Sequence, residues 1–231
     1  MADSLTYIAI WGQLLPIVAL LFVRRPTPPA LWLTGAALGL MFVQDTFMLI
    51  VAGTGINNLW LTHAALPLTT GLIVWSFSFW QVSKLARDAV RIAVAIYVVV
   101  WLVVSLAVED FQQFSRFTAP LQALLVLSVA GYTLVTSFRG TDTPLRAPWF
   151  WVSLGWALYF GIVVVHDPIS QLLLNAGQME YLRTSYYVKA GFGVLSLLLL
   201  TGGVLCGRSR PTFGGSFSQP PAPSRFSSSP S

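Results

Sequence analysis

Charged residues are scarce in this sequence of 231 residues: Asp, Glu, Lys and Arg make up 9% of it, against roughly 25% in an average soluble domain. Cysteine occurs once and histidine twice, so neither a disulfide framework nor a Cys/His zinc site can be assembled within the chain. Lys84 and Lys189 are the only lysines, which excludes a lysine-rich surface for nucleic acid. Hydrophobic residues make up 55% of the sequence, and its mean hydropathy is +0.72. These values predict a protein embedded in a lipid bilayer, with no nucleic-acid partner.

Seven apolar segments have the roughly 17 to 25 residues that a membrane-spanning helix needs. They cover residues 5–23, 29–52, 58–81, 89–108, 117–138, 148–165 and 182–206. Short polar stretches separate them, among them Arg24-Arg25-Pro26 and His166-Asp167-Pro168. The sequence therefore predicts an all-α fold, a polytopic membrane bundle of seven transmembrane helices over residues 1–206.

The remaining residues and the basic side chains predict an orientation. Residues 207–231 are rich in Gly, Ser and Pro and have no hydrophobic period, so we expect a disordered tail. Basic residues prefer the short loops on the cytoplasmic side. If the N-terminus is outside, ten of the 13 lysines and arginines fall on that side. We therefore predict an outside N-terminus, a cytoplasmic tail and a multi-pass protein of the inner (plasma) membrane, with the lipid bilayer as its partner.

Three ionisable side chains, those of Asp45, His63 and Lys189, lie inside the predicted spans. Such groups are expensive in a bilayer unless they are paired or hydrated, and they commonly mark functional sites. Counted at 1.5 Å per residue from the predicted helix ends, all three lie roughly 10 Å below the outer surface. We expect one common site, with Lys189 as the residue that contacts a ligand, Asp45 as its counter-charge and His63 as a titrating neighbour.

Other polar and aromatic side chains fall in the same layer. Gln13, Gln122 and Tyr159 lie at that depth on three further helices, and Trp156 and Tyr186 provide aromatic walls. These residues predict a ligand-binding polar pocket in the outer half of the bundle. For Gln13 and Gln122 the alternative is a hydrogen bond between neighbouring helices, which uncharged amides commonly make.

Two short motifs resemble those of microbial rhodopsins. In the seventh span, Lys189-Ala190-Gly191-Phe192-Gly193 is similar to the Lys-x-Gly-Phe-Gly stretch around the retinal-bearing lysine of that family. In the sixth, Trp156-x-x-Tyr159 resembles the aromatic pair that packs against retinal. The resemblance implies retinal as a cofactor, bound through a Schiff base at Lys189. The chain departs from the family at Ser185, where an aspartate is usual, and in the third span, which has no acidic residue.

The residues leave three functions open. The main interpretation is a receptor-like sensor that binds a small ligand in the outer-half pocket. A rhodopsin-like photoreceptor is one alternative, and a small proton-coupled transporter is the other, because buried Asp, His and Lys are the residue types of proton relays. We do not expect an enzyme or a metal site, since two histidines are too few for a histidine-rich zinc centre and no Gly-x-Ser-x-Gly nucleophile motif occurs.

Overall fold

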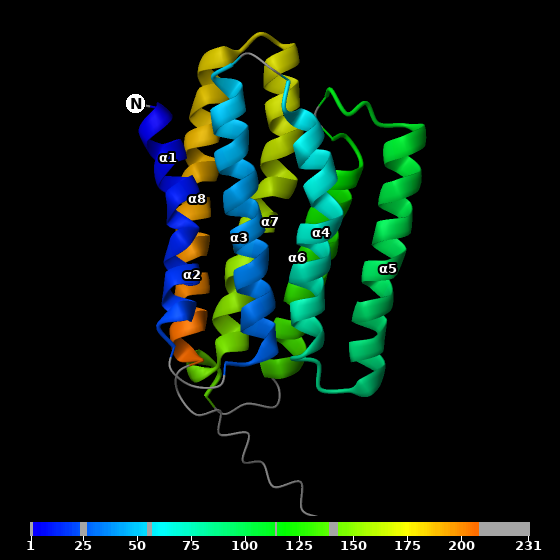
Figure 1. Ribbon diagram of the computed structural model, residues 1–231, viewed down its shortest axis with the longest axis vertical. Coiled ribbons are helices and arrows are strands. Elements are labelled where there is room, and N and C mark those ends of the chain that lie inside the picture. The colour runs from blue at the N-terminus through cyan, green and yellow to red at the C-terminus, as the bar shows by residue number, and fades with distance from the viewer. Residues whose placement is uncertain (1, 24–26, 55–56, 114, 139–142, 208–231) are drawn as a thin grey trace, which may run out of the picture.

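The computed structural model describes residues 2–23, 27–54, 57–113, 115–138 and 143–207, which form a bundle of roughly parallel and antiparallel helices (Figure 1). The helices of this described part are α1 (Ala2–Gly12), α2 (Leu14–Leu21), α3 (Pro29–Ala52), α4 (Leu59–Ser78), α5 (Lys84–Ala107), α6 (Thr118–Phe138), the 3₁₀ helix η1 (Pro144–Arg146), α7 (Pro148–Asn175) and α8 (Met179–Cys206). No strand occurs among these residues, which confirms the all-α prediction for them. Apart from Gly207, the predicted tail over residues 207–231 lies outside the described residues.

Prolines explain where several helices begin and break. Pro29 and Pro148 are the first residues of α3 and α7, a position where the missing N–H removes no hydrogen bond of the helix. Pro16 lies inside α2 and cannot donate to the carbonyl of Gly12, the fourth residue before it. The chain accordingly breaks between α1 and α2, and Gln13 is the residue at the break.

Among the described residues, five helices are long and apolar enough to cross a membrane: α3, α5, α6, α7 and α8. The apolar stretch of α1 and α2, Tyr7–Leu21, is shorter. In α4, the polar side chains of His63 and of several threonines and serines lower the mean hydropathy of the helix. The structure therefore fits a membrane-embedded helical protein in which five of the seven predicted spans meet this standard.

Two of the predicted boundaries are wrong. The sequence predicts a break at His166-Asp167-Pro168, but α7 runs through these residues to Asn175. Pro168 removes one hydrogen bond, the one to the carbonyl of Val164, yet proline is tolerated inside helices of membrane bundles. The longer helix brings His166 and Asp167 into the bundle. Likewise α5 begins at Lys84, five residues before the predicted span.

Helices α7 and α8 form the central pair of the packing arrangement. α8 contacts α7 on one side and α1 and α2 on the other, while α6 connects α7 to α4, and α3 packs between α2 and α4. α5 lies at the edge of the bundle against α4 and α6 (Figure 1). The largest fully buried side chains are those of Trp156, Phe77, Leu31, Leu38, Ile73 and Leu200.

Two glycines allow α7 and α8 to approach closely. A Cβ atom added at Gly203 of α8 would lie 2.6 Å from Cγ2 of Val152 and 3.2 Å from the backbone oxygen of Pro148, both on α7. A Cβ atom at Gly155 of α7 would lie 2.8 Å from Cγ of Leu200 on α8. Small residues at such contacts let helix backbones come close and gain van der Waals packing, which is a main source of association between membrane helices.

We predict that Gly203→Ala destabilises the protein and that Gly202→Ala, one residue away, does not. The added methyl group at position 203 meets backbone atoms that cannot rotate away, and such overpacking costs about 1–3 kcal/mol. At Gly202 no atom lies within 4 Å of the added Cβ, so the alanine gains helix propensity of up to about 1 kcal/mol. Thermal unfolding of both variants in detergent provides the measurement. Equal midpoints for the two would show that the close α7–α8 contact does not limit stability.

Candidate functional site

An ion pair joins α7 and α8 at one end of the bundle. Nζ of Lys189 donates to Oδ1 of Asp167 at 2.9 Å, and the two side chains are 30% and 37% exposed. Nδ1 of the buried His166 lies 3.1 Å from the same carboxylate oxygen. Its other ring nitrogen, Nε2, lies 3.0 Å from the hydroxyl of Ser170 and 3.4 Å from that of Ser185. We call these five residues the Lys189 cluster.

The cluster forms because two antiparallel helices place its residues at matching heights. Asp167 precedes the end of α7 at Asn175 by eight residues, and Lys189 follows the start of α8 at Met179 by ten. At 1.5 Å per residue these positions are about 12 and 15 Å from that end of the helix pair. The amine and the carboxylate therefore meet only because α7 continues past Val165.

Asp45 is not the ion-pair partner of Lys189, contrary to the sequence prediction. Oδ2 of Asp45 instead accepts a hydrogen bond from Nε2 of Gln13 at 2.6 Å, joining the α1–α2 break to α3. Lys189 lies near enough to Asp45 for an electrostatic interaction, but Asp167 takes the ion-pair position. The interhelical hydrogen bond that was the alternative for Gln13 is thus present.

The predicted aromatic residues lie on α7 and α8, the two helices that carry the Lys189 cluster. The ring of Tyr186 packs edge-on against His166, with 4.8 Å between the ring centres. Trp156 and Tyr159 pack edge-on against one another on α7 at 6.1 Å, and Trp156 is fully buried. Tyr159 is within electrostatic range of Asp45 and Asp167. The structure thus brings Lys189, Tyr159 and Tyr186 into one region.

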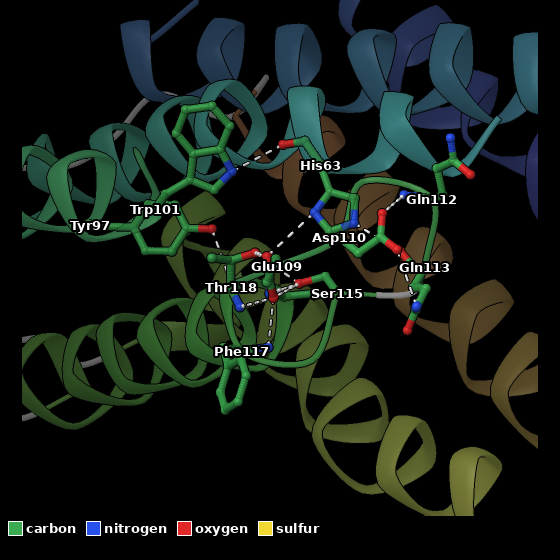
Figure 2. Close-up of polar contacts among 11 residues, drawn as sticks. His63, Tyr97, Trp101, Glu109, Asp110, Gln112, Gln113, Ser115, Phe117 and Thr118 are labelled. Carbon is green, nitrogen blue, oxygen red and sulfur yellow. Dashed lines mark hydrogen bonds and ion pairs between the residues drawn. The ribbon is translucent and has the colours of Figure 1, made fainter. Parts of the chain in front are cut away.

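His63 belongs to a different group of side chains, so its predicted place beside Lys189 and Asp45 is wrong. It is fully buried on α4, and its Nδ1 lies 3.4 Å from Oε2 of Glu109. Nε2 lies 2.9 Å from the backbone oxygen of Gln113, to which it donates. Glu109 and Gln113 come from the segment between α5 and α6 (Figure 2). With Ser115 and Thr118 they form what we call the His63 cluster.

Glu109 holds the beginning of α6. Its Oε1 accepts hydrogen bonds from the backbone N–H groups of Phe117 and Thr118 at 2.8 and 3.0 Å and from the Ser115 hydroxyl at 2.8 Å. Its Oε2 accepts from the Thr118 hydroxyl at 2.6 Å (Figure 2). Burial by itself raises the pKa of Glu109, but these hydrogen bonds outweigh it and lower the pKa from 4.5 to about 2. The carboxylate is therefore ionised, which also suits its place at a helix N-terminus.

The two ring nitrogens of His63 have different surroundings. Nε2 carries a proton, because a carbonyl oxygen such as that of Gln113 can only accept. Nδ1 faces the ionised Glu109 and makes no hydrogen bond with any described residue. A second proton bound at Nδ1 would thus form an ion pair between α4 and the α5–α6 segment.

Pro67 explains a further contact of His63. Proline has no N–H, so the carbonyl of His63, four residues earlier, has no partner within α4. The indole Nε1 of Trp101 on α5 donates to this oxygen at 3.1 Å (Figure 2). Nearby, Nε2 of Gln122 on α6 donates to the Thr69 hydroxyl at 3.1 Å, the helix-to-helix role that was the alternative for this glutamine.

Sequence reasoning missed Asp167, His166 and Glu109, since each was expected in an outer loop. Ser115 and Thr118 signal a helix start, because hydroxyl residues are preferred N-caps, but this pattern does not point to Glu109, which precedes them by six and nine residues. No signal marks Asp167 either. Within the described ranges, no three His, Cys, Asp or Glu side chains are grouped closely enough to hold a metal ion.

We predict that Glu109 makes stability fall in acid. Its folded pKa of about 2 is below its ordinary value of 4.5, so its contribution is complete above pH 4.5 and is lost as the pH falls towards 2. Glu109→Gln removes a charged acceptor and lowers the free energy of unfolding at neutral pH by about 2 kcal/mol. Thermal unfolding against pH measures both effects, with the exposed Glu180→Gln as control. A variant at position 109 that keeps the wild-type acid profile would refute this assignment.

Comparisons with known proteins do not assign this chain to a family. Neither a family model, nor a curated protein, nor a solved structure matches the chain. The five long apolar helices of the described residues are consistent with an integral membrane protein.

Proposed function

We propose that this protein is a seven-helix receptor-like sensor of the inner (plasma) membrane, with its N-terminus outside. The five long apolar helices support the membrane location. The broken pair α1 and α2 would act together as a sixth span and α4 as the seventh, because both run along the bundle beside the other helices (Figure 1). The Lys189 cluster then lies towards the outer side.

The observation that carries the sensor proposal is the partial exposure of the Lys189–Asp167 ion pair. Buried ion pairs need good geometry and full hydrogen bonding to offset desolvation. Lys189 has three N–H donors, of which one is bonded to Asp167, whereas Asp167 is shared with His166. The ammonium group is therefore the partner with free binding capacity. It suits a small anion, and the adjacent ring of Tyr186 suits an apolar tail.

Binding at this place would reach the rest of the protein through α7 and α8. A ligand carboxylate that accepts a hydrogen bond from the Lys189 ammonium weakens the bond between Lys189 and Asp167. These two residues are on different helices, so the ligand alters a contact between α7 and α8. The close contacts at Gly155 and Gly203 on the same helices leave no room for small shifts. Because tightly packed interfaces switch between discrete arrangements, occupancy at Lys189 can change the packing of the helix pair.

We predict that small amphipathic carboxylates stabilise the protein through Lys189. The test titrates the protein in detergent with straight-chain carboxylates from acetate to octanoate and follows the thermal unfolding midpoint. A ligand at a hundredfold excess over its Kd stabilises by about 2.7 kcal/mol. Lys189→Gln abolishes the shift, because the variant offers no charge to the anion.

Arg183→Gln is the matched control, since it removes an exposed basic residue from the same end of α8. It keeps the response of the wild type. If no carboxylate shifts the midpoint, or if Lys189→Gln responds like the wild type, the proposed binding site is wrong.

A retinal-binding photoreceptor is the second candidate, and the position of Asp167 favours it. The rhodopsin-like motif at Lys189 needs an anion beside the amine, and the carboxylate at 2.9 Å can provide one. The Lys189 amine would condense with the retinal aldehyde and release water, and the one proton of its ammonium form that stays on the nitrogen would give a positive charge facing Asp167. Trp156 and Tyr159, on the same helix as Asp167, are the aromatic pair of that resemblance.

For this candidate we predict a visible absorption band after expression with all-trans-retinal. Lys189→Ala and Lys189→Arg both lack the band, although arginine keeps the positive charge, because neither side chain can form the covalent bond. The measurement is the visible absorption spectrum of the wild type and of both variants, each expressed with and without retinal. No band in the wild type eliminates the photoreceptor and leaves the carboxylate test unaffected.

A further inference from the structure

The first two turns of α5 carry a basic face. They lie at the end of the bundle opposite to the segment between α5 and α6 (Figure 1). Lys84, Arg87 and Arg91 are spaced by three and four residues, which places them on one side of the helix. Within the described part of the chain, none of the three has an acidic group within ion-pair distance. Asp88 is the acidic residue of the same turns, so the face holds three positive charges against one negative.

Arg91 is held by neutral groups at the end of α4. The guanidinium of Arg91 lies over the rings of Trp75 and Phe79, with 5.2 and 5.9 Å to the ring centres, and its Nε donates to the Ser78 hydroxyl at 3.4 Å. These contacts fix the position of the cation and leave its charge uncompensated. Trp75 and Phe79 are partly exposed, as is usual for aromatic residues at a membrane interface.

Arg87 is bound in a similar way but less completely. Its Nη2 donates to the backbone oxygen of Gln81 at 3.4 Å. Its Nε is buried and has no hydrogen-bond partner among the described residues. A buried N–H without a partner is costly, so this arginine retains capacity for an acceptor.

An exposed apolar strip continues from the basic face along α5. Successive residues on the same side of the helix are small or aliphatic, and all are exposed: Ala95, Val98, Leu102 and Leu106. They follow Arg91 at spacings of four, three, four and four residues, the repeat of one helix face. One side of α5 thus presents cations at its end and about 20 Å of hydrocarbon-compatible surface above them.

We propose that this side of α5 binds an anionic phospholipid, with the headgroup phosphate at Arg87 and Arg91 and one acyl chain along the apolar strip. Phosphate oxygens are the acceptors that guanidinium groups bind best, through paired hydrogen bonds. The cations alone would suit any phosphate-bearing molecule. The strip that begins directly above Arg91 favours a molecule in which the phosphate carries a hydrocarbon chain.

The experiment measures the binding of phosphatidylglycerol to the detergent-purified protein by native mass spectrometry. The wild type binds phosphatidylglycerol more tightly than phosphatidylcholine. Arg87→Gln and Arg91→Gln each weaken the binding of phosphatidylglycerol about fivefold, as expected for the loss of one basic residue near an anionic lipid surface. Neither variant changes the affinity for phosphatidylcholine. Lys84→Gln is a milder variant, because the exposed Lys84 side chain makes no hydrogen bond or ion pair with the described residues. It keeps the test valid if an arginine variant does not fold.

Arg116→Gln is the matched control, since it removes an exposed cation from the opposite end of the bundle. Its affinity for phosphatidylglycerol equals that of the wild type. Inorganic phosphate and glycerol 3-phosphate compete weakly if the acyl chain contributes. Competition by either at the lipid's own concentration would assign the face to a soluble phosphate and overturn the lipid proposal. Equal affinity of the wild type and all three variants at positions 84, 87 and 91 would overturn it as well.

Discussion

The structure depends on one constraint: a peptide group that is shielded from water must find its hydrogen-bond partner inside the protein. Helices satisfy this constraint for most of the chain, and proline is the residue that breaks it. At Pro67 the unpaired carbonyl of His63 receives the indole N–H of Trp101 from α5. A defect in one helix is thereby converted into a bond between two. This bond helps to hold α5, which otherwise lies at the edge of the bundle.

The same constraint applies to the side chains, and it arranges them in pairs across helices. Gln13 binds Asp45, Gln122 binds Thr69, Lys189 binds Asp167 and His63 faces Glu109. The two residues of each pair are at least 22 positions apart in the sequence. The pairs differ in how completely they are satisfied. Glu109 receives four hydrogen bonds and is part of the architecture, whereas Lys189 keeps unused donors and partial exposure, which suits a group that exchanges partners.

The composition and apolar segments predict the helices well, because burial of apolar surface and helix length leave few alternatives at 9% charge. They place Lys189, Asp45 and His63 at one predicted depth, but a shared depth does not determine which way a side chain points around its helix. His63 consequently faces Glu109 and not Lys189. Asp167 was missed for another reason: His-Asp-Pro resembles a turn, and only packing against α8 shows that the helix continues. The local sequence around Asp167 does not predict that packing.

The length of α7 and α8 has a consequence for the environment of the ion pair. Each has 28 residues, which at 1.5 Å per residue is about 42 Å, whereas the hydrocarbon core of a bilayer is about 30 Å thick. The two helices therefore project beyond the hydrocarbon or tilt within it. If the excess length is shared equally between the two ends, each end extends about 6 Å beyond the hydrocarbon, and Lys189 and Asp167, about 12 to 15 Å from one end, lie about 6 to 9 Å inside it. A thinner membrane admits water to the pair and a thicker one covers it, so the thickness of the bilayer itself tunes how strongly the two charges interact.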